Sequence, residues 1–346
     1  MPDSVNKMYD LTVVGAGPVG LFGIFYAGMR GLSINVLDSL EMVGGQLNAL
    51  YPEKYIYDMP GFPKVMAKDL VRALMEQAES AKPELHMGRK VSRIVPVEGT
   101  PRYLEVHCEN GEVFHSRTVM LALGMGAFKP RKLEVPGLLE REGKNVNYFV
   151  HNLDKYNGKH VLVIGGGDSA ADWTLALGAP DVTGKVRAKS VTMIHRTDKF
   201  AAHESTITHL KNLTHASVVT HTELQSLDEE GGRLACTLVQ NLTKQVTMKT
   251  FDEIIVCAGY IAKLDFVKES GLEMQGNAVK VNEKMETNVP GVFAVGDVCT
   301  HGGKLKLIAT GVGEAAIAAN FAKVHIDPAA KAFPGHSTSI MGKKEE

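Results

Sequence analysis

A glycine-rich turn occurs twice in the chain, each time directly after a short apolar segment. The first turn reads GAGPVG over residues 15–20 and follows residues 8–14, and the second reads GGGDSA over residues 165–170 and follows residues 159–164. A strand, such a turn and then a helix bind a dinucleotide pyrophosphate, because the glycines allow close backbone approach and the helix N-terminus offers free N–H groups. The repeat predicts an α/β chain with two dinucleotide sites, and 346 residues are enough for two domains.

The residue that ends the next strand differs between the two turns. After the first turn a predicted strand ends at Asp38, 18 residues after Gly20, where a carboxylate accepts hydrogen bonds from a ribose hydroxyl pair. The matching strand after the second turn ends at His195 and Arg196, and a cation there suits a 2′-phosphate. Such an arginine is often only solvated, but its place after this turn favours NADPH. The candidate residues are Gly15, Gly17, Pro18, Gly20 and Asp38 for the first site, and Gly165, Gly166, Gly167, Asp168, Ser169, His195 and Arg196 for the second.

Later apolar segments extend both units. Residues 118–124 and 251–259 are predicted strands that each stop at a glycine. Residues 287–297 are a further strand that leads to a Gly-Asp corner. Since ligands bind at the carboxyl edge of parallel sheets, Asp297 is a candidate to accept a hydrogen bond from a ribityl hydroxyl. Apolar spacing predicts a helix over residues 305–321. If a flavin binds near the N-terminus of this helix, the helix dipole would favour the reduced, anionic form of the flavin.

Charge and cysteine content exclude several other classes of protein. The formal net charge of −1 gives no field to attract nucleic acid or an anionic membrane. Residues 11–29 lack charge, but their glycines and proline predict a strand, a turn and a helix rather than a membrane span. Residues 1–10 do not resemble a signal peptide, so we expect a cytoplasmic protein. The four cysteines include no Cys-x-x-Cys pair, so we expect neither a metal site nor a disulfide framework and interpret most of them as buried apolar residues.

The order of these motifs resembles the two-dinucleotide flavoprotein reductases, and among them the thioredoxin-reductase-like group, over nearly the whole chain. This resemblance implies FAD in the first turn and NADPH in the second. In thioredoxin reductase a redox Cys-x-x-Cys lies just before the second turn, whereas this chain has NYFVH at residues 147–151. Without a dithiol the chain lacks the agent of thiol–disulfide exchange, so we do not expect a thioredoxin reductase.

Two segments resemble the ferredoxin–NADP⁺ reductases of thioredoxin-reductase type. They are GGQLNALYPEKYIYD at residues 44–58 and FPGHSTS at residues 333–339. In that family the tyrosine that matches Tyr51 stacks on one face of the isoalloxazine, and an aromatic residue that matches His336 covers the other face from the partner subunit. A packing tyrosine and an ordinary tail histidine are the alternatives. The resemblance also assigns to the flavin site Gln46, Val91, Phe128, Ser337 and Thr338.

The resemblance implies an enzyme that passes a hydride between NADPH C4 and flavin N5, and then single electrons to or from ferredoxin or flavodoxin. Such carriers are acidic, so the basic residues 129–132 are a candidate docking patch, although a solvated linker would look the same. The family commonly has two arginines after the histidine. Thr197 replaces the second, which predicts a weaker preference for NADPH unless Lys199 compensates. An NADPH diaphorase, a quinone reductase or a flavin reductase differs only in the acceptor and stays open, as does a non-catalytic redox sensor.

The expected architecture is α/β, with two Rossmann-like three-layer dinucleotide-binding domains. The NADPH-binding domain, residues 124–260, is expected to be inserted into a discontinuous FAD-binding domain, residues 1–123 and 261–346, which includes the C-terminal tail. Two short crossings would act as a hinge. The family resemblance adds a symmetric homodimer in which each tail reaches the flavin of the other subunit.

Overall fold

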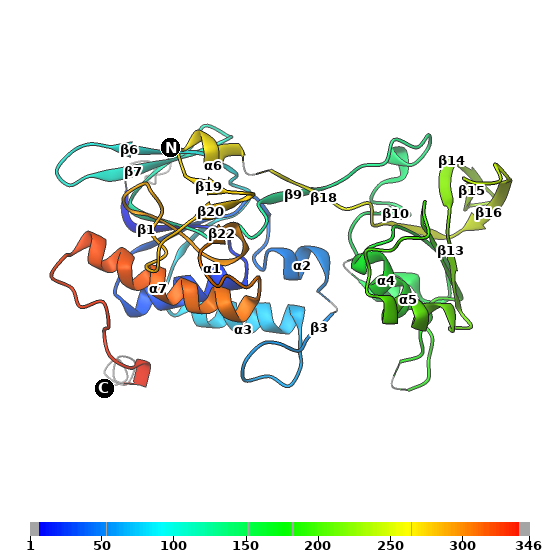
Figure 1. Ribbon diagram of the computed structural model, residues 1–346, viewed down its shortest axis with the longest axis horizontal. Helices are drawn as coiled ribbons and strands as arrows, with labels where there is room; N and C mark the ends of the chain where they lie inside the picture. Colours follow the sequence, from blue (N-terminus) through cyan, green and yellow to red (C-terminus); the bar gives the residue numbers. More distant parts are fainter. Residues whose placement is uncertain (1–6, 53, 151, 182, 264, 339–346) are drawn as a thin grey trace. The chain divides into compact units, whose positions relative to one another are not determined.

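The chain forms two compact units in the computed structural model (Figure 1). The first unit comprises residues 1–127 and 262–346, and the second comprises residues 128–261, so the second interrupts the first in sequence. The structure describes residues 7–338 except 53, 151, 182 and 264, and it does not describe the side chains of residues 127–129 and 260–265.

A seven-stranded sheet forms the centre of the first unit. In spatial order it contains β5 (Glu84–His86), β2 (Ile34–Leu37), β1 (Met8–Val14), β8 (Val113–Leu121), β7 (Tyr103–Cys108) and β6 (Val91–Val97), and β21 (Val292–Ala294) pairs with β8. Neighbouring strands in this sheet are parallel except in the pairs β6–β7 and β7–β8. Parallel strands are buried on both faces, which is why β1 and β2 read as apolar runs in which Leu11, Val13 and Val36 are fully buried.

Helices α1 (Pro18–Met29), α3 (Ala67–Glu79) and α7 (Ile308–Ile326) lie together in the first unit, and α1 packs against both of the others (Figure 1). Helices α1 and α7 approach closely because α7 carries a glycine at the contact. A Cβ at Gly311 would lie only 2.5 Å from the Val19 side chain. Helix α7 begins three residues later than the sequence predicted, since Leu307 adopts an extended conformation with φ −123° and ψ 148°.

The second unit has a parallel sheet of its own. Its order is β10 (Val146–Asn147), β17 (Glu253–Val256), β11 (His160–Ile164), β12 (Ser190–Ile194) and β13 (Ala216–Val219). Helices α4 (Asp168–Gly178) and α5 (Glu204–Lys211) pack against it. An antiparallel sheet contains β14 (Thr222–Glu230), β15 (Arg233–Gln240) and β16 (Val246–Phe251). Both sheets share one core, in which Leu162, Leu234 and Ile254 are fully buried.

Shorter elements complete both units. The first unit also contains α2 (Gln46–Leu50), β3 (Tyr55–Ile56), β4 (Val65–Met66), α6 (Asp265–Glu269), β19 (Met274–Gln275), β20 (Ala278–Lys280), η4 (Gly296–Val298) and β22 (Cys299–Thr300). The second contains η2 (Leu139–Arg141) and η3 (Leu153–Tyr156). Where the chain crosses between the units, β9 (Ala127–Pro130) and β18 (Tyr260–Lys263) form a two-stranded sheet.

The predicted fold class is confirmed, since two Rossmann-like α/β units are present and one is inserted into the other. Residues 11–29 form the predicted strand, turn and helix, because β1 ends at Val14 and α1 starts at Pro18. Among the helices of the described chain, none combines the length and the apolar character that a bilayer crossing requires.

Candidate active site

The first glycine turn leaves no room for side chains at two of its glycines. Gly15 has φ +108°, and a Cβ there would lie 2.4 Å from the carbonyl oxygen of Ala122 at the end of β8. A Cβ at Gly20 would lie 2.0 Å from Gly15 O. Gly17 caps α1 and Pro18 is the first helical residue. The atom nearest to a Cβ at Gly17 would be 4.0 Å away, so the space before the helix N-terminus is open to a phosphate.

Asp38 ties this turn to the end of β2. Its carboxylate is buried, and it accepts the main-chain N–H groups of Ala16 at 2.7 Å and Leu40 at 2.8 Å. Burial raises the pKa of Asp38, and these hydrogen bonds only partly oppose the rise. A carboxylate has about four acceptor positions, so Asp38 can hold the turn and still accept a ribose hydroxyl.

Tyr51 and Asp297 are brought together from distant parts of the sequence. Tyr51 is half-buried after α2 and packs against the core, while Asp297 lies in η4, which follows β21. Burial raises the pKa of the Tyr51 hydroxyl, and the nearby negative charges of Asp297 and Asp58 raise it further. The Lys54 ammonium lies 5.4 Å from the centre of the Tyr51 ring. A half-buried aromatic ring thus lies within electrostatic reach of a carboxylate at the carboxyl edge of the parallel strands.

The other residues predicted for the first site are placed unequally. The Gln46 side-chain nitrogen lies 3.0 Å from where a Cβ of Gly124 would be, just beyond β8. Val91 is 4% exposed in the core, so only its main chain is available to a ligand. Phe128 belongs to β9, but its side chain lies outside the described residues.

The tail residues lie on the surface. His336, Ser337 and Thr338 are exposed, and the Phe333 ring meets the His336 ring edge-on at 5.5 Å. Arg30, just after the end of α1, donates a hydrogen bond to Lys331 O at 2.6 Å. The glycine turn lies at the opposite end of α1, so the tail starts from the far end of that helix.

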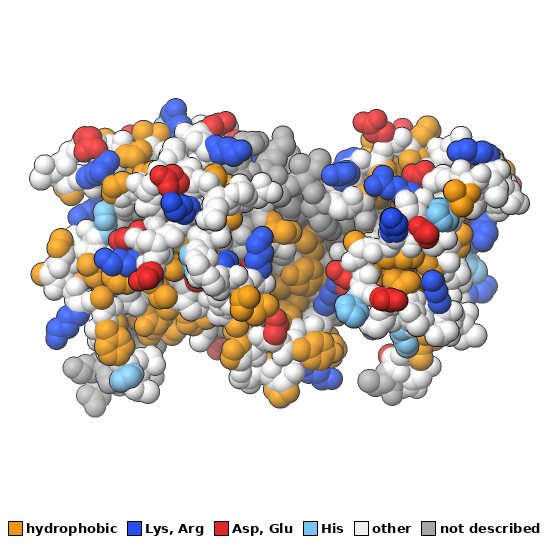
Figure 2. Space-filling view, in the orientation of Figure 1, with side chains coloured by type: hydrophobic (Ala, Val, Ile, Leu, Met, Phe, Trp, Pro, Cys, Tyr) orange, Lys and Arg blue, Asp and Glu red, His pale blue; other side chains and the backbone are white. Residues whose placement is uncertain are grey.

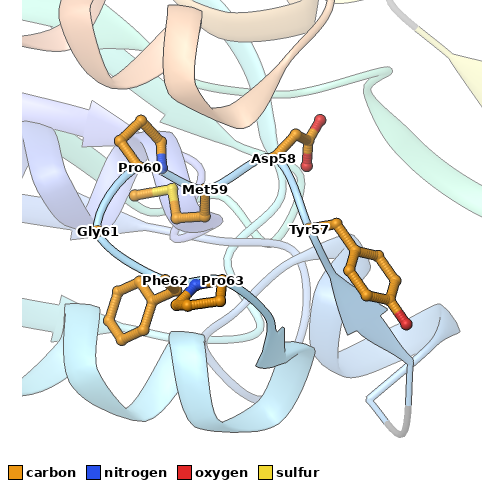
Figure 3. Close-up of a pocket in the computed structure, with 7 residues that line it drawn as sticks. All are labelled: Tyr57, Asp58, Met59, Pro60, Gly61, Phe62 and Pro63. Carbon is orange, nitrogen blue, oxygen red and sulfur yellow. The ribbon is translucent and has the colours of Figure 1, made fainter.

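A surface hollow of about 540 Å³ lies in the loop between β3 and β4 and is lined by residues 57–63 (Figure 3). Figure 3 shows Met59 and Phe62 on facing sides of the loop, whereas Tyr57 points away from them. Tyr57 is 71% exposed and Phe62 is 42% exposed. No sequence motif predicts this hollow.

The second turn repeats the crowding of the first. Gly165 has φ +152°, and a Cβ there would lie 2.5 Å from the carbonyl oxygen of Cys257, just beyond β17. Gly167 caps α4 and has no atom within 4 Å of a Cβ position, so the space before this helix is also open. Asp168 begins α4, and its carboxylate accepts the His203 N–H at 3.3 Å. Ser169 follows in the first turn of α4.

His195 lies on the second turn instead of pointing away from it. A Cβ at Gly166 would lie 2.3 Å from its imidazole. The ring nitrogen Nε2 is 3.1 Å from Lys199 O, and the Phe200 ring lies 5.2 Å away. The Ala201 N–H donates to Gly166 O at 2.9 Å, which closes this loop onto the turn.

Arg196 presents its guanidinium to solvent next to the second turn. Its side chain is exposed, as are those of Thr197 and Lys199. The Asn241 amide donates to Arg196 O at 3.2 Å and so holds the main chain that carries the cation. Sequence reasoning missed Asn241, because it follows β15 and is brought here only by the fold.

The predicted basic patch at residues 129–132 is partly neutralised. Lys132 forms an ion pair with Glu142, and its ammonium lies 3.9 Å from the centre of the Tyr148 ring. Arg131 is exposed, and the Lys129 side chain lies outside the described residues. Figure 2 shows acidic and basic side chains interspersed over the visible face, in keeping with the net charge of −1.

Sequence reasoning also missed Glu314. Its carboxylate is buried and accepts the Gly296 N–H at 2.8 Å, next to Asp297. One signal was available, since Glu314 is the single acidic residue in the otherwise uncharged residues 308–322.

Comparison with known proteins relates the whole chain to reductases. Residues 9–319 match the sequence signature of the pyridine nucleotide-disulphide oxidoreductase family. The chain is 45% identical over 337 residues to a ferredoxin–NADP reductase of Halalkalibacterium halodurans, with 97% of this chain and 99% of that relative covered. It is 46% identical over 336 residues to ferredoxin–NADP reductase 2 of Shouchella clausii, again with 97% and 99% covered.

Solved structures of thioredoxin reductases share the fold. The enzyme of Lactococcus lactis in its FR conformation aligns with a TM-score of 0.72 and 27% identity, over 92% of this chain and 99% of that one. The T. acidophilum enzyme aligns with a TM-score of 0.73 and 23% identity, over 94% and 100%. This chain has four cysteines and no Cys-x-x-Cys pair, so the likeness concerns the scaffold and not thiol chemistry.

Proposed function

Because the chain belongs to the pyridine nucleotide-disulphide oxidoreductase family and is a thioredoxin-reductase-like ferredoxin–NADP reductase, we propose that its first unit binds FAD and its second unit binds NADPH. The observation that carries this assignment is the contrast between the two strand ends. The buried carboxylate of Asp38 follows the first turn, whereas the exposed guanidinium of Arg196 follows the second. We therefore assign the FAD-binding domain to the first unit and the NADPH-binding domain to the second, with junctions at residues 127/128 and 261/262.

The residues of the first unit fit FAD. The open space at Gly17 accepts a pyrophosphate in front of α1, and Asp38 is positioned for the adenosine ribose. Tyr51 offers a ring face for the isoalloxazine, and Asp297 offers an acceptor for a ribityl hydroxyl. Gln46 completes the proposed site in this unit, and Val91 contributes through its main chain. Phe128, the first residue of the second unit, stays a proposed FAD contact on the family resemblance alone.

The residues of the second unit fit NADPH. Gly167 leaves open the space before α4, where main-chain N–H groups and the Ser169 hydroxyl can donate to a pyrophosphate. Asp168 would repel a phosphate, but its hydrogen bond to the His203 N–H holds it toward the neighbouring loop. Arg196 supplies a forked donor for the 2′-phosphate, with His195 packed against Gly166 beneath it.

The protein contributes to the reaction by positioning. Bound FAD would supply the chemistry that the side chains cannot, namely hydride exchange at N5 with nicotinamide C4 and single-electron exchange with a carrier. Tyr51 orients the ring system and keeps water from one of its faces, and the two glycine turns fix the pyrophosphates. No protein nucleophile is required, so the rate depends on geometry and on exclusion of water.

The tail supports a homodimer in which each chain completes the site of the other. Helix α1 has 12 residues, a length of about 18 Å, and Arg30 holds Lys331 at the end opposite the glycine turn. This favours action of His336 on a second subunit, where it would cover the free flavin face with Ser337 and Thr338 near the reactive edge. Deletion from residue 333 onward should change flavin fluorescence and turnover. If neither changes, the tail has no role at the flavin.

Ferredoxin or flavodoxin is the proposed electron carrier, and the cytoplasm is the proposed compartment. Arg131 is exposed in the 129–132 segment, and Lys132 is exposed as well but has its charge offset by Glu142. The four cysteines are free thiols, and Cys108, Cys236 and Cys299 are buried.

The function is tested by mixing the NADPH-reduced protein with ferredoxin, flavodoxin and thioredoxin in turn in a stopped-flow instrument. We expect ferredoxin or flavodoxin to reoxidise the flavin much faster than a small dye of similar potential does. Equal rates with the dye would show a diaphorase, a quinone reductase or a flavin reductase instead. A colourless protein that takes up no FAD would refute the proposed function altogether.

A further inference from the structure

A buried ion pair closes the segment between η4 and α7 onto the helix. Lys304 Nζ donates to both carboxylate oxygens of Glu314, at 2.6 and 2.7 Å. His301 Nε2 lies 3.0 Å from Oε1, and the Cys299 thiol donates to Oε2 at 3.6 Å. The side chains of Lys304 and Glu314 are only 7% and 4% exposed. One helical carboxylate therefore fixes three residues of the preceding segment.

The same carboxylate holds the Gly-Asp corner. Glu314 Oε2 accepts the main-chain N–H of Gly296 at 2.8 Å, and Asp297 is the next residue. Gly296 has φ +75°, and its Cα lies 3.3 Å from where a Cβ of Gly311 would be. The corner thus contacts α7 along one helical turn, from Gly311 to Glu314. Any movement of this turn of α7 displaces Asp297.

Glu314 and Lys304 carry opposite charges, so the pair is neutral only when both are present. Burial raises the pKa of Glu314, but the hydrogen bonds from Lys304, His301 and Gly296 outweigh burial and leave that pKa below its usual value of 4.5. The carboxylate is therefore charged at neutral pH. Burial raises the pKa of the Cys299 thiol to about 12, so the thiol adds no charge. Removal of either partner would leave one uncompensated charge in a low-dielectric interior.

We propose that Glu314 and Lys304 are positioning residues for the flavin. They hold the corner that carries Asp297 and the start of α7 in the geometry that binds FAD, and each offsets the charge of the other, so that the pair adds no net charge that would bias flavin reduction. Their effect passes through Asp297 and the N-terminus of α7. This inference rests on the proposed binding of FAD by the first unit.

Two consequences separate this role from a purely structural one. If the corner is displaced, the folded protein binds FAD more weakly, because Asp297 no longer accepts the hydrogen bond from the ribityl hydroxyl. An uncompensated charge near the flavin changes its midpoint potential, because reduction adds negative charge. The shift should be upward when Lys304 alone remains charged and downward when Glu314 alone remains charged. Loss of packing by itself has no reason to shift the potential in opposite directions.

The experiment compares Glu314→Gln, Lys304→Met and the double variant with the wild-type holoprotein. Deflavinated protein is titrated with FAD by fluorescence quenching, and the midpoint potential of the reconstituted flavin is measured by spectroelectrochemistry. We expect FAD affinity to fall about tenfold or more in each single variant. We expect the potential to rise in Glu314→Gln, to fall in Lys304→Met and to return toward the wild-type value in the double variant.

Glu253→Gln is the matched control. Glu253 is a second buried carboxylate, 4% exposed on its side chain, and it pairs with Lys159 at 2.8 Å and Lys155 at 3.1 Å. It lies in the second unit, so its loss should lower the unfolding temperature without changing FAD affinity or potential. If Glu314→Gln does not fold, Lys304→Met against this control makes the same test.

Three outcomes would overturn the inference. In the first, the variants at 314 and 304 lose thermal stability but keep wild-type FAD affinity and potential, as the control does. In the second, both single variants shift the potential in the same direction. In the third, wild-type protein itself fails to bind FAD, which refutes the proposed function as well. The first two leave the proposed function intact, so the two failures are distinguishable.

Discussion

Gly15 in the first unit and Gly165 in the second occupy matching places. A Cβ would lie 2.4 Å from Ala122 O in one and 2.5 Å from Cys257 O in the other, each just beyond the strand that neighbours the turn. The strand ends differ, since Asp38 turns inward to the Ala16 N–H while Arg196 is exposed. The two units therefore have the same glycine turn for binding a pyrophosphate, and they differ in the strand-end side chain that selects the nucleotide.

The largest expected effect comes from adding a Cβ atom to one glycine turn at a time. Gly15→Ala should weaken FAD binding about 100-fold, because the Cβ meets a main-chain oxygen that cannot move. Gly165→Ala should weaken NADPH binding to a similar extent and leave FAD bound. Absorbance of the purified flavin and titration with NADPH measure the two effects.

Gly31→Ala and Gly184→Ala are the controls for these substitutions. Gly31 has φ +69° and Gly184 has φ +83°, and neither has an atom within 4 Å of a Cβ position. They test backbone strain without a collision. If the controls weaken their nucleotides as much as Gly15→Ala and Gly165→Ala do, close packing is not the reason for the glycines.

The buried carboxylate of Glu314 in the first unit is tested by its dependence on pH. Glu314→Gln should lower the free energy of unfolding by about 3 kcal/mol at pH 7, because it leaves Lys304 buried without its partner. The folded-state pKa of Glu314 is lowered, so its contribution is present above 4.5 and is lost as the pH falls through the folded-state value. Urea unfolding of both proteins from pH 7 downward should show the difference shrinking below pH 4.5. A difference that stays constant with pH would contradict the role of the charge.

Removal of the exposed guanidinium of Arg196 tests directly whether the side chain at the strand end selects the nucleotide. Arg196→Ala should raise the KM for NADPH roughly 10- to 150-fold and leave the KM for NADH unchanged, since only NADPH carries the 2′-phosphate. Steady-state reduction of ferricyanide reports both values. Lys199→Ala is the companion variant. If it raises the KM for NADPH as much as Arg196→Ala does, the 2′-phosphate binds at the loop after Thr197.

The smallest effect is expected in the basic segment before the second unit. Lys132→Ala should change the KM for ferredoxin less than about fivefold, because Glu142 already offsets this charge at a partly exposed site. Arg131→Ala is the comparison, and it should have the larger effect and a steeper dependence on salt. Cytochrome c reduction through added ferredoxin measures both.

Local rules made much of this molecule predictable. The glycines of both turns, the strands before them and the acid or cation after them follow from backbone sterics and short-range spacing, and the structure places β1 and β11 within a residue of the expected segments. The start of α7 was predicted three residues early, because apolar spacing continues through Leu305 and Leu307 although the backbone there is extended.

By itself, the sequence determined the two-unit α/β fold and the two glycine turns, because each of these depends on neighbouring residues. Only the tertiary structure decided which side chains meet across the chain. It pairs Glu314 with Gly296 and Lys304, lays His195 on Gly166, holds Lys331 at Arg30 and cancels the charge of Lys132 with Glu142. Such contacts depend on how separate elements pack, and no spacing within one segment encodes that packing.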